Sequence, residues 1–358
     1  MPSLKEIKGR INSISSTLAI TSAMKMVAAA KLQKAQMAIQ NMLPYERRLH
    51  SMLIDLMGAM NISAAASEDG SVRGSGSAER GFDQSGDRLS LSNRHDLAGM
   101  DGAYSLMAQR EVRKVAIVAF ASNSSLCGVF NSNAIREATA VINEYRASGL
   151  GDADITVYSV GRKMAEAMKK LGFPSPADFT KMSDSPSYDA ASALAQELFD
   201  GFVSGRFDKV ELVYNHYKST SSQPTTRQTY LPLSLADATA DLQAGKITDS
   251  ASESDTNRGA EPVGAPVVRQ GSPTTEDLIV EPSKEALIAT LLPKVIRLRV
   301  FTTLLDSAAA EHAARTVAMQ LATDNGNDLL QELTLEYNKG RQQKITSEIL
   351  DLVGGSMQ

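Results

Sequence analysis

An apolar repeat in the first sixty residues constrains the fold more than any other feature of the chain. Its members are spaced by three and four residues: Leu4, Ile7, Ile11, Ile14 and Leu18, then Leu32, Ala35, Ile39, Met42, Tyr45, Leu49, Met52 and Leu56. This is the heptad spacing of helices that pack along a shared seam. It predicts one helix from residue 3 to about residue 60, on the order of 80 Å long. Such a helix needs a partner along its length, because long globular helices owe most of their stability to packing.

Polar residues interrupt the repeat between Leu18 and Leu32. The next two seam positions are Thr21 and Lys25, and two methionines, a run of small residues and three lysines lie around them. Packing against a partner helix alone would favour Leu or Ile at both positions. Further along, Pro44 is expected to kink or locally unwind the helix.

A second helical pattern runs from Ser283 to the end of the sequence. Pro293 and Gly326 are expected to interrupt it, and Gly354 with Gly355 to end it. The economical way to bury both terminal stripes is against each other. We therefore expect an antiparallel two-stranded coiled coil that stands off the rest of the chain.

The middle of the chain alternates short apolar runs with amphipathic segments. The predicted strands are 113–120, 153–161, 208–217 and 225–233, and the predicted helices are 133–148, 162–172 and 188–205. This alternation implies a small, mainly parallel sheet. The predicted fold class is therefore α/β, with a long antiparallel coiled coil of the N- and C-terminal helices and a small Rossmann-like α/β domain.

Two segments rich in glycine, serine and charged residues separate these parts, and the second holds eight acids and three bases. Such composition buries little and is typical of insertions. The predicted division is a coiled-coil helix at 1–60, a flexible insertion at 61–110, an α/β domain at 111–234, an acidic insertion at 235–277 and a second coiled-coil helix at 278–358.

Charge is unevenly distributed along a chain whose net charge is −4. Residues 1–50 hold eight Lys or Arg and two acids, which suits nucleic acid, an acidic protein surface or simply a solvated helix face. Residues 284–358 hold eight bases and nine acids, which argues against nucleic acid. The start of the sequence lacks a secretory signal, and no apolar run approaches the length of a membrane span. The single cysteine excludes an internal disulfide. We therefore expect a cytoplasmic location.

No catalytic constellation is evident. The loop after the first strand, residues 122–128, has neither glycine-rich phosphate motif, so a structural turn is favoured over a nucleotide site. Cys127 has no histidine near it in sequence, and the four histidines (His50, His95, His216 and His312) lack the spacing of metal ligands. We expect no active site, cofactor or metal, and a mechanical or binding role.

Two blocks carry a resemblance to a known family. They are "RINSISSTLAITSAMKMVAAAKLQKAQ" near the start and "AAEHAARTVAMQLATDNGNDLLQELTLEYNKGRQQKITSEILDLVGG" at the end, with "SLCGVFNSN" and "VELVYNHYKSTSSQPTTRQTYLPL" between them. Together they resemble the gamma subunit of the F-type rotary ATP synthase. The resemblance covers all but the two insertions. Ala19 and Ser22 stand where the family commonly has lysine, so the basic face is thinner than in relatives. Residues 123–125 and 129 replace the charged and second-glycine positions of the family's loop, and a local contact of that charged pair is not expected here.

The resemblance implies a central-stalk rotor subunit that couples proton-driven rotation to ATP synthesis or hydrolysis on the beta subunits. Its implied partners are the alpha and beta subunits, the epsilon subunit and the membrane c-ring. The implied location is peripheral, on the cytoplasmic face of the bacterial inner membrane, without membrane insertion. Matching positions imply that the following residues contact the alpha and beta subunits: Met24, Lys25, Lys31, Arg341, Gln342 and Thr346.

Small residues, flexible methionines and lysines would then serve an outer partner as well as the inner seam. The alternatives are a coiled-coil scaffold with an α/β head, which calls for an unbroken seam, and a small α/β enzyme with helical arms, which calls for a phosphate loop or acid–base cluster.

Overall fold

The computed structural model describes residues 3–68, 110–233 and 284–356. Two long helices flank a small α/β domain, and they are α1 (Leu4–Glu68) and α8 (Lys284–Ser356). The domain holds β1 (Val115–Phe120), α3 (Phe130–Ala147), β2 (Ile155–Val160), α4 (Arg162–Lys170), α5 (Thr180–Asp184), α6 (Tyr188–Val203), β3 (Lys209–Asn215) and β4 (Thr225–Leu231). Within the predicted insertions, residues 61–68 belong to α1, whereas 69–109 and 235–277 lie outside the described residues.

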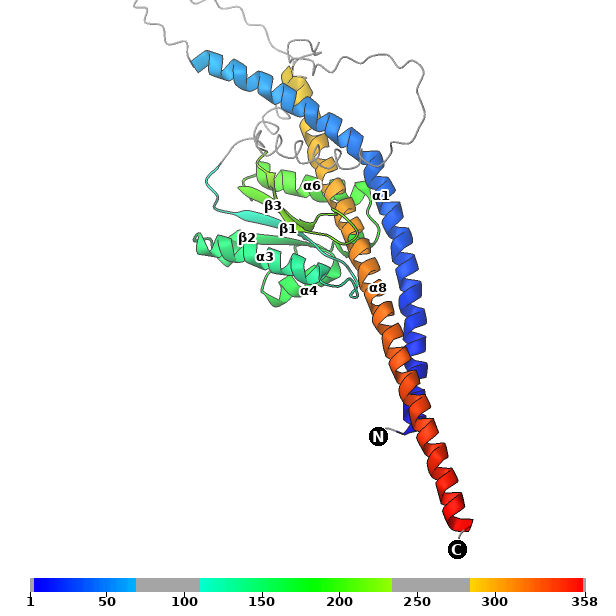
Figure 1. The fold of residues 1–358 in the computed structure, drawn as a ribbon. Helices are drawn as coiled ribbons and strands as arrows, with labels where there is room; N and C mark the ends of the chain where they lie inside the picture. The colour runs from blue at the N-terminus through cyan, green and yellow to red at the C-terminus, as the bar shows by residue number, and fades with distance from the viewer. Residues whose placement is uncertain (1–2, 69–109, 234–283, 357–358) are drawn as a thin grey trace, which may run out of the picture.

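The two long helices pack against each other in opposite directions, as expected (Figure 1). Three contacts set the register, since Leu18 lies against Gly326, Lys25 against Gln320 and Glu46 against Thr302. Leu4, at the start of α1, lies opposite Gly340. The last turns of α8 therefore extend beyond the end of the pair.

The predicted interruptions of α8 are wrong, because the helix continues through Pro293, Gly326 and both terminal glycines to Ser356. An interior proline disfavours a helix by about 3 kcal/mol. The neighbouring Leu292 and Ile296 are buried, and burial of such side chains contributes about 1.5–3 kcal/mol each. At Gly326 a Cβ would lie 2.6 Å from Leu18 Cδ2, so the glycine makes room for the seam. At the C-terminal end, each added helical residue gains one hydrogen bond on an existing helix.

The N-terminal helix also runs past its predicted end at residue 60, reaching Glu68, and it continues through Pro44. Its direction changes along its length, so its upper part leaves the line of α8 (Figure 1). The predicted seam positions Tyr45 and Met52 are wrong, because both are exposed, whereas Leu49 and Leu53 are buried. Once α1 bends, a different face meets its neighbours, and the heptad register no longer applies.

The sheet confirms the mainly parallel α/β arrangement. Its strand order is β2-β1-β3-β4, with β1 parallel to both neighbours and β4 antiparallel to β3. Residues of β1 alternate between two cores, as expected for a strand covered on both faces. Val115, Ile117 and Ala119 face α3 and α4, whose Val141 and Met164 are buried there.

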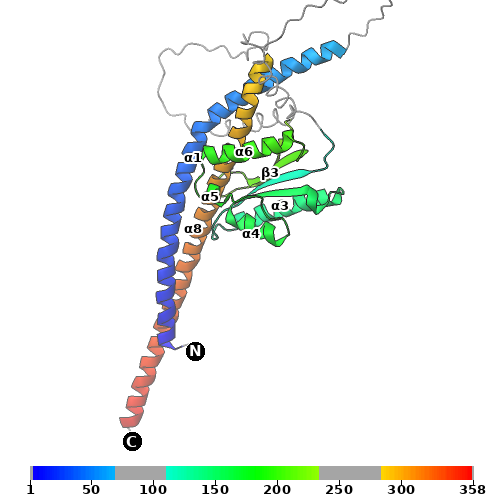
Figure 2. The same ribbon diagram turned by 180° about the vertical axis from the view of Figure 1, so that it is seen from behind.

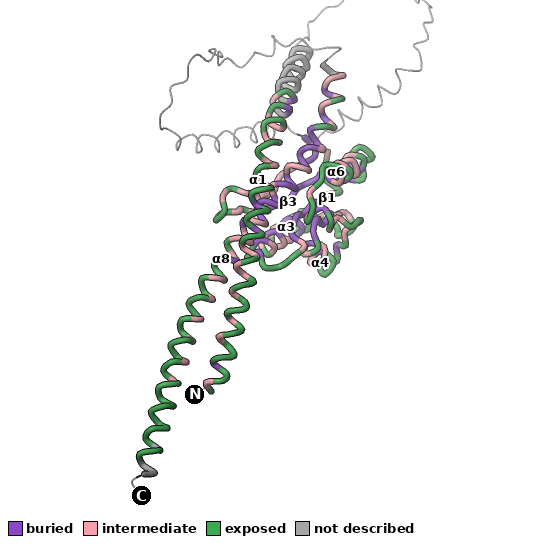
Figure 3. Tube along the Cα trace, turned by 90° about the vertical axis from the view of Figure 1, so that its right-hand side faces the viewer, coloured by how far each residue is buried: buried purple, intermediate pink, exposed green. Residues whose placement is uncertain are grey.

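The opposite face of the sheet is covered by α6 and by the first half of α8 (Figure 2). Ala116, Val118 and Phe120 of β1 share this core with Leu298 and Leu304 of α8. The expectation that the helix pair stands off the rest of the chain is therefore wrong for the first half of α8, which packs on the sheet. Buried residues gather where α8 passes the sheet, and α8 is mostly exposed beyond it (Figure 3). One stretch of α8 is both half of the helix pair and a structural layer of the domain.

A buried charge cluster lies on the α3 side of β3 and β4. Glu211 is 1% exposed and accepts hydrogen bonds from Tyr145 Oη at 2.7 Å and Arg227 Nε at 2.7 Å, and its Oε1 lies 2.7 Å from Lys209 Nζ. Burial alone would raise the pKa of Glu211, but these three partners hold it below its ordinary value. The carboxylate thus links β3, β4 and α3 in its charged form.

Replacing Glu211 with alanine is expected to lower the free energy of unfolding by about 3 kcal/mol, because two cations lose their buried partner. A depressed carboxyl pKa stabilises the fold above the unfolded-state pKa of about 4.3, and the stabilisation is lost as pH falls through the folded-state value. Chemical unfolding of both proteins at pH 7 and at decreasing pH measures the effect. Glu111→Ala breaks a fully exposed pair with Arg113 and is the matched control, expected to change nothing measurable. Equal unfolding curves for the two variants would contradict the role of the cluster.

Candidate partner-binding surface on the helix pair

The polar residues that interrupt the repeat of α1 stay on the inner side of the pair. Thr323 Oγ1 donates to Thr21 Oγ1 at 3.1 Å, and Lys25 Nζ donates to Gln320 Oε1 at 2.6 Å. Ala28, the next position in the same register, is 2% exposed and leads on to the buried Leu32. The seam therefore keeps its spacing through this level, but polar and small side chains occupy it.

The outer side of the same level is apolar. On α1, Ile20, Met26 and Val27 are exposed, Met26 by 63%, and on α8 Val317 and Leu321 are exposed, Leu321 by 60%. A helix pair alone in water carries its apolar residues inside and its polar residues outside. Here the distribution is reversed, which is typical of a surface that a partner covers.

Basic and neutral groups lie beside this apolar surface. Lys31 is exposed, and no described carboxylate forms an ion pair with it. On α8, buried Glu311 pairs with Arg315 at 2.7 Å, and burial raises the pKa of Glu311 despite that partner. Burial, with Arg315 and Lys31 nearby, lowers the pKa of His312 to about 4, so its imidazole is neutral near pH 7. Lys31 is therefore an accessible positive charge at this level.

A second exposed surface is the end of α8. Arg341, Gln342 and Thr346 are all exposed, and Thr346 donates its hydroxyl hydrogen back to the Gln342 carbonyl oxygen at 2.9 Å. Apolar side chains are exposed around the same turns: Ile345, Ile349, Leu350, Leu352 and Val353. This segment extends past α1 as a single exposed helix (Figure 3). The spacing of these apolar residues places them on more than one side of the helix.

The six residues implied as partner contacts therefore form two groups. Met24 and Lys25 lie at the level of Gln320, with Lys31 further along α1 near His312, and the other three lie on α8 from Arg341 onward. Arg341 is twenty-one positions after Gln320 on the same helix, or roughly 30 Å away. Met24 and Lys25 are half-buried, whereas the other four are exposed. The exposed apolar residues Val27 and Leu321 were not predicted from the sequence. An apolar residue off the heptad seam is a signal for an outer apolar surface, and Val27 carries that signal.

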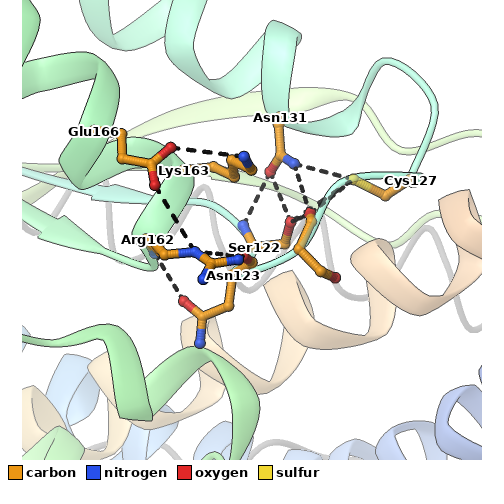
Figure 4. Close-up of polar contacts among 8 residues, drawn as sticks. Ser122, Asn123, Cys127, Asn131, Arg162, Lys163 and Glu166 are labelled. Carbon is orange, nitrogen blue, oxygen red and sulfur yellow. Dashed lines mark hydrogen bonds and ion pairs between the residues drawn. The ribbon is translucent and has the colours of Figure 1, made fainter.

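The loop after β1 is a polar turn, held by hydrogen bonds within the loop and to neighbouring elements. Ser122 N and Oγ both donate to Asn131 Oδ1 at 3.0 Å, and Asn131 Nδ2 lies 3.1 Å from Cys127 Sγ (Figure 4). Arg162 closes the turn from α4 by donating to the Asn123 carbonyl oxygen. Cys127 is buried, and Leu126 has a φ of 68° with its side chain exposed. Most of these polar groups are therefore engaged with one another or with α4.

Two further kinds of site, a metal centre and a membrane-spanning helix, can be checked in the described residues. The part of the chain that the structure describes holds no group of three or more His, Cys, Asp or Glu side chains placed to bind a metal. None of its helices is long and apolar enough to span a bilayer. His216 pairs with Asp306, whereas the His50 side chain and His95 lie outside the described residues.

Comparison with known proteins identifies the family. A family model described as ATP synthase matches residues 3–357. The "ATP synthase gamma chain" of Phocaeicola vulgatus is 47% identical over 357 residues, and that of Bacteroides thetaiotaomicron is 45% identical over 358 residues, each with 100% of both chains covered. A chain in a cryo-EM structure of the Euglena gracilis mitochondrial ATP synthase (OSCP/F1/c-ring) has 18% sequence identity and a TM-score of 0.52. The match covers 99% of this chain and 93% of that chain, and it shows a shared fold. The resemblance seen in the sequence is confirmed, and the chain belongs to the ATP synthase gamma chain family.

Proposed function

We propose that this chain is the central-stalk rotor of an F-type ATP synthase. The observation that carries the proposal is the reversed helix pair, with Thr21 and Lys25 in the seam and Val27 and Leu321 exposed outside it. A shaft enclosed by other subunits can carry apolar residues on its outer surface, because those subunits cover them. A free scaffold needs a polar outer surface, because water covers it. The chain has no catalytic role of its own in this proposal, and ATP is made or hydrolysed on the beta subunits.

In this proposal the helix pair threads a ring of alpha and beta subunits. The α/β domain is attached to one side of the pair, so the rotor is asymmetric (Figure 1). As an asymmetric shaft turns, it contacts the surrounding beta subunits differently, and each contact biases the conformation and hence the nucleotide affinity of that subunit. The α/β domain is the part that the epsilon subunit and the membrane c-ring hold, which places the chain peripherally at the cytoplasmic face of the inner membrane.

The chemistry of the outer surface suits contacts that form and release in turn. Methionine adapts its shape to changing neighbours, as Met26 is placed to do. An exposed lysine attracts an acidic surface by no more than about 1 kcal/mol. Lys31 can therefore attract an acidic partner loop and still release it as the shaft turns. Lys25 differs, because its side chain is half-buried and its ammonium group already donates a hydrogen bond to Gln320.

The contacts we propose for the end of α8 are of another kind. Arg341, Gln342 and Thr346 are placed on a single helix among exposed apolar residues. A guanidinium, an amide and a hydroxyl supply directional hydrogen bonds to a partner loop. The surrounding leucines and isoleucines would slide against an apolar collar, since dispersion and hydrophobic contacts have no preferred direction.

Reversing the charge of Lys25 and Lys31 to glutamate tests the electrostatic part of the proposal. ATP-driven proton pumping by the assembled enzyme is expected to fall several-fold, because acidic partner loops would be repelled, while assembly is retained. Lys25→Arg with Lys31→Arg keeps both positive charges at the same positions and is the matched control, expected to leave pumping within twofold of the parent. Normal pumping by the glutamate double variant would count against this part of the account.

Replacing Val27 and Leu321 with asparagine tests the apolar part. Both side chains are more than half exposed, so the stability of the free chain is expected to stay the same. Binding of the double variant to alpha and beta subunits is expected to weaken roughly thirtyfold, since each of the two residues loses about 1 kcal/mol of burial in the complex. Titration of the alpha and beta subunits with each variant measures this. Leu171→Asn, on the exposed end of α4, is the control, and equal affinity for all three proteins would rule out an apolar contact at this level.

A further inference from the structure

The connector between β3 and β4 contacts both long helices at one level. Its first two residues bind one carboxylate of α8: His216 Nδ1 lies 2.6 Å from Asp306 Oδ2, and Tyr217 N donates to Asp306 Oδ1 at 2.9 Å. Both oxygens of Asp306 are thus engaged by the α/β domain. Two hydrogen bonds to one planar group restrict rotation as well as separation.

The next contact reaches α1. Gln36 Nε2 of α1 donates to Tyr217 Oη at 2.7 Å. The Tyr217 ring packs against two small clusters, one formed by Leu32, Ala309 and Ala313 and the other by Cys127, Phe130 and Ala310. One side chain therefore contacts α1, α8 and the start of α3. The alanines of α8 leave the room in which the ring fits between the helices.

Asp306 also favours the charged form of His216. Its hydrogen bond raises the pKa of His216 above the ordinary value, against the opposing effects of partial burial and of Lys218. An ionised partner makes the hydrogen bond shorter and stronger than a neutral pair. The contact between domain and helix therefore has the character of an ion pair, in agreement with its geometry.

Neighbouring contacts between the domain and the helix pair are less directional or reach α8 alone. Tyr230 Oη donates to the Ile296 carbonyl oxygen at 3.0 Å, and Arg315 Nη2 donates to Ser124 Oγ at 2.7 Å, and both of these bonds involve only α8. The apolar core shared by the sheet and α8 resists separation, but apolar contact is non-directional and resists turning poorly.

We propose that His216, Tyr217 and Asp306 form a clamp that sets the angle of the α/β domain on the helix pair, so that torque on the domain reaches α1 and α8 together. This inference rests on the proposed rotor function, because only a rotating shaft needs the domain to be fixed against turning. The three are positioning residues, and none of them contacts a partner in this proposal. Without the clamp, the domain would yield under load before the shaft turns.

The test uses the assembled, membrane-bound enzyme and the number of protons pumped for each ATP hydrolysed. Tyr217→Phe keeps the ring and removes the bond to Gln36, and it is expected to lower that ratio about twofold. Asp306→Ala combined with Tyr217→Phe is expected to lower it at least fivefold while ATP hydrolysis stays within twofold. Ser221→Ala, in the same connector but directed at Ser219, is the matched control and is expected to pump normally. A fold that was merely loosened would lose assembly and hydrolysis along with pumping, and the ratio would not move.

Gln36→Leu supplies a further check that does not depend on the stability of the Asp306 variant. If Gln36 and Tyr217 act as a pair, Gln36→Leu with Tyr217→Phe lowers the ratio no more than either change alone. Unchanged ratios in Tyr217→Phe and Gln36→Leu would overturn the clamp while leaving the rotor function intact. Failure of the parent enzyme to pump at all would overturn the rotor function, and the clamp with it.

Discussion

The structure depends on the packing of α8 against two partners at once. Its first half shares a core with the sheet through Leu298 and Leu304, and it pairs with α1 along the same stretch and beyond. Because one helix serves both contacts, the α/β domain and the helix pair form a single body. Most helical stability in proteins comes from tertiary packing, so the packing of α8 positions the surfaces of the described helix pair that other proteins could contact.

The polar seam follows from the same arrangement. Between Leu18 and Leu32 the inner positions of α1 are Thr21, Lys25 and Ala28 rather than large apolar residues. Such a seam is weaker than one of leucines, and the apolar residues outside it stay exposed in the chain alone. The polar seam and the exposed apolar residues both make an isolated pair less stable. Neither is unfavourable if other subunits surround the pair and cover its outer surface. The stability that the pair lacks would then come from the assembly.

The sequence predicts the fold well where local pattern decides it. Heptad spacing identified the paired helices, and the apolar runs located all four strands to within two residues. It failed where a tertiary contact decides the outcome. Pro293 and Gly326 look like breaks until the packing of Leu292 and Leu18 around them is known. The cover that α8 provides for the sheet, and the joining of Tyr217 to Gln36, connect residues far apart in the chain and leave no local signal. The two groups of contact residues were inferred from the family resemblance alone. The structure gives their positions on α1 and α8 and their exposure.

The most direct test of the central claim is the reactivity of a cysteine placed on the outer apolar surface. The natural Cys127 is buried, so Val27→Cys supplies the accessible thiol, and Ala147→Cys at the exposed end of α3 is the reference. Labelling with a maleimide is compared for the free chain and for its complex with alpha and beta subunits. The account predicts that both thiols react quickly in the free chain and that only the thiol at position 27 becomes protected, at least tenfold, in the complex. Equal reactivity of that thiol in both states would contradict an enclosed shaft.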